Sequence, residues 1–194
     1  MATPQATAGA GHVLDFWLGA GPEKWYRQDD AFDDEITRRF GDLWNRGAAG
    51  ALDEGWATNP RGALALIILL DQFPRNMFRG EARAFHSDER AKSIACYALD
   101  RGWDLREPEP QRQFFYMPFM HSELLVDQDH CVRLFAERMP GENVLHARAH
   151  REVIRRYGRF PYRNDALGRT TSEREQAFLD GGGYGAIVNE LKED

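Results

Sequence analysis

The stretch NPRGALALIILLDQFPRN, residues 59–76, decides the fold. Asn59 can cap a helix with its side-chain oxygen, and Pro60 suits the first helical position. The residues that follow are apolar on nearly every side, so we expect a central, buried helix. Because proline disfavours the α conformation of the residue before it, we expect this helix to run to Phe73 and to end there.

The segments on either side of this helix show helical periodicity, and none convincingly alternates apolar and polar residues as a half-buried strand would. The sequence therefore predicts an all-α fold: a single domain of about eight to ten helices in stacked antiparallel pairs, resembling tetratricopeptide repeats. We expect a disordered tail over residues 1–11 and one helical domain over residues 12–194.

Caps and breaks refine this prediction. His86-Ser87-Asp88 precedes an apolar pattern, and we interpret Ser87 and Asp88 as its N-terminal cap. A kink is expected around Pro118 in a helix that begins after Pro110. Ser172 with Glu175 forms a capping-box pattern for a last helix, which should stop at the glycines 181–183.

Composition limits the function classes. The 25 basic and 31 acidic residues give a net charge of −6, which argues against generic binding to nucleic acid or to a membrane surface. The longest aliphatic run, residues 63–70, is far shorter than the roughly 20 residues that a membrane span needs. No secretory pattern is seen in residues 1–11. Cys96 and Cys131 have no metal-site spacing and are expected to be buried free thiols. A soluble cytoplasmic protein is the expectation.

A proline-broken signature occurs twice, as LDQFPRN at residues 70–76 and as GRFPYRN at residues 158–164. We call these segments the first corner and the second corner. Each corner follows a helical pattern and has Phe-Pro where the helix is expected to stop. The Arg and Asn of each corner then lie beside the last carbonyls of that helix, which have no partner within the helix. We predict that the two corners share one polar pocket, to which they contribute Asp71, Gln72, Arg75, Asn76, Arg159, Arg163 and Asn164.

Three other side chains are candidate ligand contacts. His121 and Glu123 lie in an apolar setting after Pro118, and His150 lies on the same helix face as His146. The pair His146 and His150 is either a hydrogen-bonded structural pair or a metal half-site, and the metal reading is weaker because no HExxH pattern is present. Asp71 follows a buried run, so its carboxylate needs a partner, and a corner arginine is the natural one.

Beyond these patterns, the chain resembles the bacterial domain-of-unknown-function (DUF) family nine-two-four over essentially its whole ordered length. The resemblance rests on the motifs LDQFPRN at 70–76, FYMPFMHSE at 115–123 with Gln128, and YGRFP at 157–161 with Arg163-Asn164 and LGR at 167–169, together with Asp88. It implies an all-helical fold related to tetratricopeptide-repeat proteins and carries no established activity. Members usually have a histidine where this chain has Tyr162, so a role that requires that histidine does not transfer.

Three functions stay open at this stage. The first is binding of a small anionic ligand or a peptide carboxylate in the two-corner pocket, because arginine recognises carboxylate and phosphate. The second is a tetratricopeptide-like scaffold that binds proteins. The third is a metal-assisted hydrolase that uses Asp71, His121, Glu123 and His150. No phosphate-binding loop or nucleophile elbow is present, and we expect no cofactor and no nucleic-acid or membrane partner.

Overall fold

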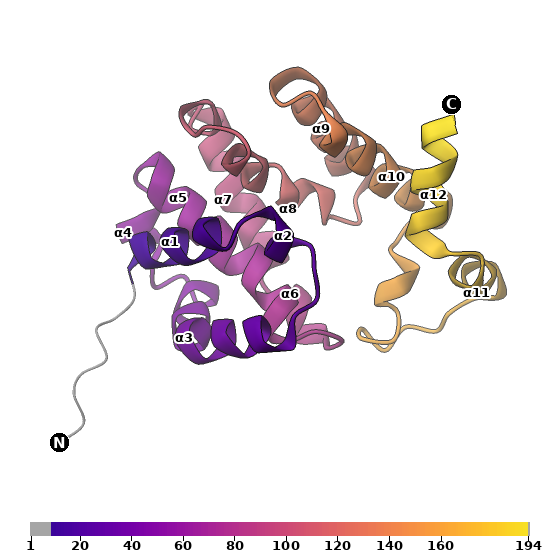
Figure 1. Cartoon of the computed structure of the whole chain (residues 1–194), viewed down its shortest axis with the longest axis horizontal. Coiled ribbons are helices and arrows are strands. Elements are labelled where there is room, and N and C mark those ends of the chain that lie inside the picture. Colours follow the sequence, from indigo (N-terminus) through magenta and orange to yellow (C-terminus); the bar gives the residue numbers. More distant parts are fainter. Residues whose placement is uncertain (1–8, 194) are drawn as a thin grey trace. The chain divides into compact units, whose positions relative to one another are not determined.

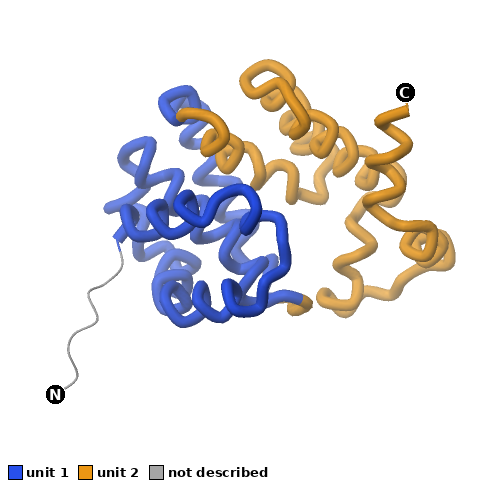
Figure 2. Tube along the Cα trace, viewed as in Figure 1, with its two compact units in different colours: residues 1–79, 83–107 blue, residues 80–82, 108–194 orange. Residues whose placement is uncertain are grey.

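The computed structural model describes residues 9–193, in which every regular element is a helix. The predicted all-α fold is therefore confirmed. The chain divides into two compact units (Figure 2). Within the described residues, unit 1 holds 9–79 and 83–107, and unit 2 holds 80–82 and 108–193. Most of the predicted tail lies outside the described residues, but Ala10 and Gly11 already belong to the first helix.

Unit 1 is built around the quoted stretch. In chain order its helices are α1 (Ala10–Ala20), α2 (Pro22–Trp25), α3 (Asp30–Ala48), α4 (Asp53–Trp56), α5 (Pro60–Ile67), a π-helical turn (Ile68–Gln72), α6 (Phe73–Met77) and α7 (Asp88–Asp100) (Figure 1). Asn59 caps α5 as expected, by accepting a hydrogen bond from the Gly62 N–H at 2.9 Å. Residues 63–70 are fully buried, because α1, α4 and α7 pack around α5.

The helix does not end at Phe73, which corrects the sequence prediction. Phe73 keeps α-helical angles, φ −59° and ψ −40°, and α6 continues to Met77. The turn before Pro74 widens to π geometry, with the Phe73 N–H bonded to the Ile68 carbonyl. A π turn re-routes the main-chain hydrogen bonds at the place where proline lacks a donor and its ring crowds the preceding turn. Arg75 and Asn76 therefore lie within a helix and not beyond its end.

Unit 2 contains a 3₁₀ turn (Gln111–Phe115), α8 (Met117–Met120), α9 (Leu125–Arg138), α10 (Glu142–Tyr157), a 3₁₀ turn (Pro161–Arg163), α11 (Glu173–Asp180) and α12 (Gly183–Glu193). A short connection joins α9 to α10, which pack side by side, and α12 packs on α10 (Figure 1). The apolar core between α10, α11 and α12 includes Val153, Phe160, Phe178 and Ile187.

Two boundaries in unit 2 differ from the predictions, at Pro118 and after α11, and the end of α10 agrees with its sequence pattern. No long helix is kinked at Pro118, because a 3₁₀ turn precedes α8 and Pro118 lies in the first turn of α8. The second-corner helix ends at Tyr157, since Gly158 adopts the left-handed conformation with φ 71°. The capping box of Ser172 and Glu175 is confirmed, but α11 is not the last helix, because α12 begins at Gly183.

The described residues also test the expectations about the two cysteines and about membrane-spanning helices. Cys131 is buried, and burial raises the pKa of its thiol, whereas Cys96 is exposed and corrects the prediction that both are buried. Among residues 9–193, no helix combines the length and the hydropathy that crossing a bilayer requires.

Candidate functional site

The first corner is held together by ion pairs within unit 1. Asp71 is fully buried and pairs with Arg75 at 3.3 Å, as the sequence predicts. The Arg75 guanidinium also donates two hydrogen bonds to the carboxylate of Asp88, at 3.0 and 2.9 Å, and one to the Asp71 carbonyl. Gln72 donates to the Asp71 carboxylate. A buried carboxylate that is paired and hydrogen-bonded in this way stabilises the corner.

Asn76 completes the first corner through α3. Its side-chain amide donates to the carboxylate of Asp33 at 2.7 Å, and Arg79 donates to the same carboxylate at 2.8 and 3.0 Å. Asp33 lies in the first turn of α3, so this contact fixes the start of α3 against the end of α6. The predicted residues of the first corner therefore connect helices α3, α6 and α7.

Ser87 satisfies a main-chain carbonyl of the π-helical turn. The Leu70 carbonyl, four residues before Pro74, accepts a hydrogen bond from the Ser87 hydroxyl at 2.6 Å. The same hydroxyl accepts from the indole N–H of Trp44 at 3.1 Å. Ser87 makes no side-chain capping bond at the start of α7, which corrects the capping interpretation. Its hydroxyl instead satisfies buried groups from two other segments.

At the second corner, Glu123 and Arg169 form a clamp. Arg169 donates to both oxygens of the Glu123 carboxylate, at 2.8 and 3.0 Å, and also to the Phe160 carbonyl. The Phe160 N–H donates to Glu123 at 2.9 Å. Although burial raises the pKa of Glu123, the hydrogen bonds from Arg169 and Phe160 and the charges of Arg169 and Arg163 outweigh it and leave the pKa below its usual value.

His121, His150 and Arg163 lie in the same electrostatic environment. Burial lowers the pKa of His150 to about 3, the bond to the His146 carbonyl opposes this shift, and the charges of His121, Arg163 and His146 add to it. Nδ1 of His150 therefore carries the proton and donates to the His146 carbonyl at 2.9 Å. Arg163 is nearly buried, with its guanidinium 4.5 Å from the ring centroid of Phe160. The pKa of Glu123 is therefore lowered by neighbouring cations and hydrogen bonds, whereas that of His150 is lowered chiefly by burial.

The histidine pair on α10 is a hydrogen-bonded structural pair. His146 Nδ1 lies 2.7 Å from the hydroxyl of Tyr184, and His150 packs against the rings of Phe160 and Tyr184. Within residues 9–193, no three His, Cys, Asp or Glu side chains are grouped closely enough to hold a metal ion. The metal half-site reading therefore has no set of ligands among the described residues.

Arg159 lines a cavity of about 360 Å³. The Arg159 guanidinium donates to both oxygens of Glu175, at 2.6 and 2.8 Å, and to the Thr170 carbonyl. These bonds, with those from Ser172, lower the pKa of Glu175. The cavity is lined by three arginines and by polar and aromatic neighbours: Arg156, Tyr157, Arg159, Ser172, Arg174 and Glu175.

Arg174 differs from the other two arginines of this cavity. Arg156 pairs with Glu152 and Glu190, and Arg159 pairs with Glu175. The guanidinium of Arg174 lies 5.2 Å from the ring centroid of Tyr157 and has no carboxylate partner in the described part of the chain. Arg174 is exposed on α11 and lies outside both corners, so no sequence motif marks it.

Asn164 remains inside the second corner. Its amide nitrogen donates to the Thr171 hydroxyl at 3.2 Å, while its side-chain oxygen is buried without a hydrogen-bond partner among the described residues. Within each unit the predicted residues are thus brought together. The prediction of one pocket shared by both corners concerns residues of two different units, and it stays a prediction.

Comparison with known proteins places the chain in a family. The family model described as "Bacterial protein of unknown function (DUF924)" matches residues 13–183. The chain belongs to the DUF924 family. A solved structure of a protein of unknown function from Agrobacterium tumefaciens, ATU0120, is similar to it, with 41% sequence identity and a TM-score of 0.85 over 89% of this chain and 97% of the other. No curated protein matches the sequence.

Proposed function

We propose that this DUF924 protein binds a small anionic ligand, such as a carboxylate-bearing metabolite or a peptide carboxylate, at the second corner. The observation that carries the proposal is the cavity beside Arg159, where the guanidinium of Arg174 has no carboxylate partner among residues 9–193. Arginine forks favour two parallel hydrogen bonds to a carboxylate. Of the three arginines that line this cavity, Arg156 and Arg159 are paired with acids, so Arg174 is the one available to an anion among the described residues.

The surrounding cluster supports an anion electrostatically. Arg163 and Arg169 lower the pKa of Glu123, and burial together with His121 and Arg163 lowers that of His150. The shift of Glu123 has the sign that a neighbouring positive charge produces, whereas burial is the largest cause of the shift of His150. In this proposal Arg159 and Arg174 contact the anion, and Glu123, His150, Arg163 and Asn164 hold the corner in shape. The first corner has the same structural role in unit 1, where it keeps helices together through Asp71, Gln72, Arg75 and Asn76.

Calorimetry with N-acetylglycine, which carries one amide and one carboxylate, tests the proposal. Arg174→Gln should weaken binding about tenfold, because it removes one charge-assisted hydrogen-bond donor. Arg148→Gln is the matched control, because Arg148 is an exposed arginine on α10 outside the cavity. Binding that Arg174→Gln leaves unchanged, or that both variants weaken equally, would remove the proposal.

A further inference from the structure

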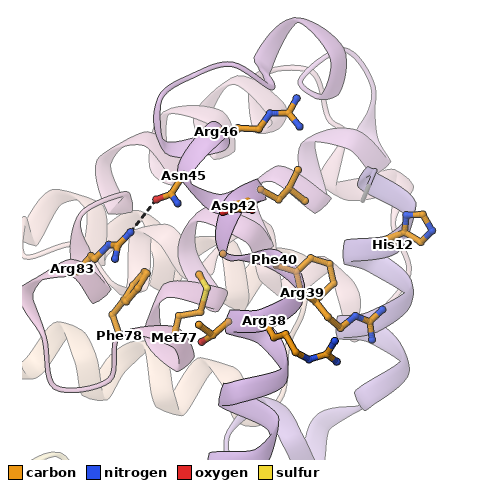
Figure 3. A pocket seen from close by; sticks show the side chains of 13 residues that line it. His12, Arg38, Arg39, Phe40, Asp42, Asn45, Arg46, Met77, Phe78 and Arg83 are labelled. Carbon is orange, nitrogen blue, oxygen red and sulfur yellow. Dashed lines mark hydrogen bonds between the residues drawn. The ribbon is translucent and has the colours of Figure 1, made fainter. Parts of the chain in front are cut away.

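A larger concave surface lies in unit 1, and none of the candidate residues of the two corners lines it. Its volume is about 650 Å³, and α3 forms most of its wall, with the end of α6 and Arg83 on the other side (Figure 3). Met77 and Phe78 contribute apolar surface between Arg83 and Arg38 in this view. We call it the α3 cavity. Its charged lining residues are Arg38, Arg39, Asp42, Arg46 and Arg83.

Arg38 and Arg46 are the arginines of the α3 cavity without a hydrogen-bond or ion-pair partner among the described residues. Both side chains are exposed. They lie eight residues apart with Asp42 midway, so the three share one face of α3. Eight residues span about 12 Å along the axis of an α-helix, so the main-chain positions of Arg38 and Arg46 lie about two turns apart. An anion that contacts both must therefore present more than one acceptor group.

The other two arginines are already fixed in place. The guanidinium of Arg83 lies 4.1 Å from the ring centroid of Phe78 and 4.9 Å from that of Trp44, and it donates to the Asn45 side chain at 2.9 Å. The guanidinium of Arg39 lies 4.7 Å from the ring centroid of Phe16 and pairs with Glu35. Because stacking already restricts these two side chains, each loses less conformational entropy when a ligand binds.

The side chains that line the α3 cavity carry more positive than negative charge. Four arginines face the lining acid Asp42 and Glu35, the partner of Arg39, which leaves two positive charges in excess. The protein as a whole has a net charge of −6, so this excess is local. Carboxylate and phosphate are the groups that a cluster of guanidinium forks recognises.

We propose that the α3 cavity binds a small polyanion that carries at least two phosphate or carboxylate groups. Arg38 and Arg46 bind its two ends, and Arg83 contributes a preset donor at the wall. Asp42 lies between the two free guanidiniums and repels the same anion, which sets a lower affinity than the arginines alone would give. The proposal concerns unit 1 and is independent of the second-corner site in unit 2.

Isothermal titration calorimetry with pyrophosphate and with citrate, on the full chain in low-salt buffer, tests this inference. The double variant Arg38→Gln/Arg46→Gln should weaken binding of at least one of the two probes by about tenfold or more, because it removes both free guanidiniums. Arg27→Gln/Arg106→Gln is the matched control, since it removes the same charge from exposed arginines of unit 1 outside the cavity. The control should change affinity less than about twofold, as distant charges are screened.

Asp42→Asn provides a test that loss of folding cannot imitate. Removing the repelling carboxylate should tighten binding severalfold, whereas Asp100→Asn, an exposed acid at the end of α7, should leave it within about twofold. Comparison of pyrophosphate with citrate identifies phosphate or carboxylate as the preferred group. Absence of binding by both probes, equal weakening by the two double variants, or no gain from Asp42→Asn would each overturn the inference.

Discussion

The contact between Ser87 and the π-helical turn makes a sharp prediction about stability. Ser87→Ala removes a hydroxyl that is 2% exposed, donates to the Leu70 carbonyl at 2.6 Å and accepts from the Trp44 indole at 3.1 Å. Each buried hydrogen bond contributes about 1–1.5 kcal/mol, so losing both should lower the free energy of unfolding by about 2–3 kcal/mol. Equilibrium unfolding in urea, followed by tryptophan fluorescence, measures this difference.

A second substitution tests the physical reason for that loss. In Pro74→Ala the main chain regains an N–H four residues after Leu70, and a return of this turn to α geometry would let that N–H bond the Leu70 carbonyl without Ser87. Pro74→Ala should therefore cost less stability in the Ser87→Ala background than in the wild type, with a coupling of about 1 kcal/mol. Ser93→Ala is the control, because its hydroxyl makes an exposed bond to the Glu89 carbonyl within the same helix.

Two outcomes would refute this reasoning. If Ser87→Ala were no more destabilising than Ser93→Ala, the hydroxyl would not satisfy buried groups. If the effects of Ser87→Ala and Pro74→Ala were simply additive, Ser87 would not substitute for the missing donor of Pro74. In either case the Leu70 carbonyl must have another partner, and the account of the first corner would be wrong.

Two further predictions concern the corners. A lysine at position 75 cannot make two parallel bonds to Asp88 while also pairing with Asp71. Arg75→Lys should therefore lower the free energy of unfolding, measured in urea, by about 1–3 kcal/mol. A change below about 0.3 kcal/mol would contradict the pairing. The pKa of His150, lowered by burial to about 3, should leave its imidazole NMR signals unchanged from pH 8 to about pH 4.5. In the unfolded chain His150 takes up a proton near pH 6.5, whereas in the folded protein it stays neutral, so the free energy of unfolding should fall as pH drops from about 7 to 5. A His150 titration midpoint near 6.5 in the folded protein would disprove the shift.

Much of the architecture could be predicted from local patterns. Apolar periodicity predicted the helices, Asn59 and Ser172 predicted two caps, and the buried position of Asp71 predicted its arginine partner. These features depend on residues within a few positions of one another, which is the range over which sequence patterns operate. The course of the chain at Pro74 could not be predicted this way. It depends on Ser87, which reaches Leu70 from another helix.

The sites were harder to predict for a related reason. Arg159 was selected because it lies in a repeated motif, yet the structure pairs it with Glu175, which lies 16 residues away. Arg174 and the arginines of α3 were not selected, because an exposed arginine on a helix has the same pattern whether or not it lines a cavity. The spacing of Arg38, Asp42 and Arg46 indicates that they share one helix face. It does not indicate a cavity, because the cavity forms only where α6 packs beside α3.

Arginine side-chain NMR provides the most direct measurement of anion binding at the second corner. During titration with N-acetylglycine, the Nε–H signals of Arg159 and Arg174 should shift and saturate together, while those of Arg148 and Arg38 stay in place. Signals that stay fixed throughout, or that drift equally for all exposed arginines, would contradict a specific site in this corner.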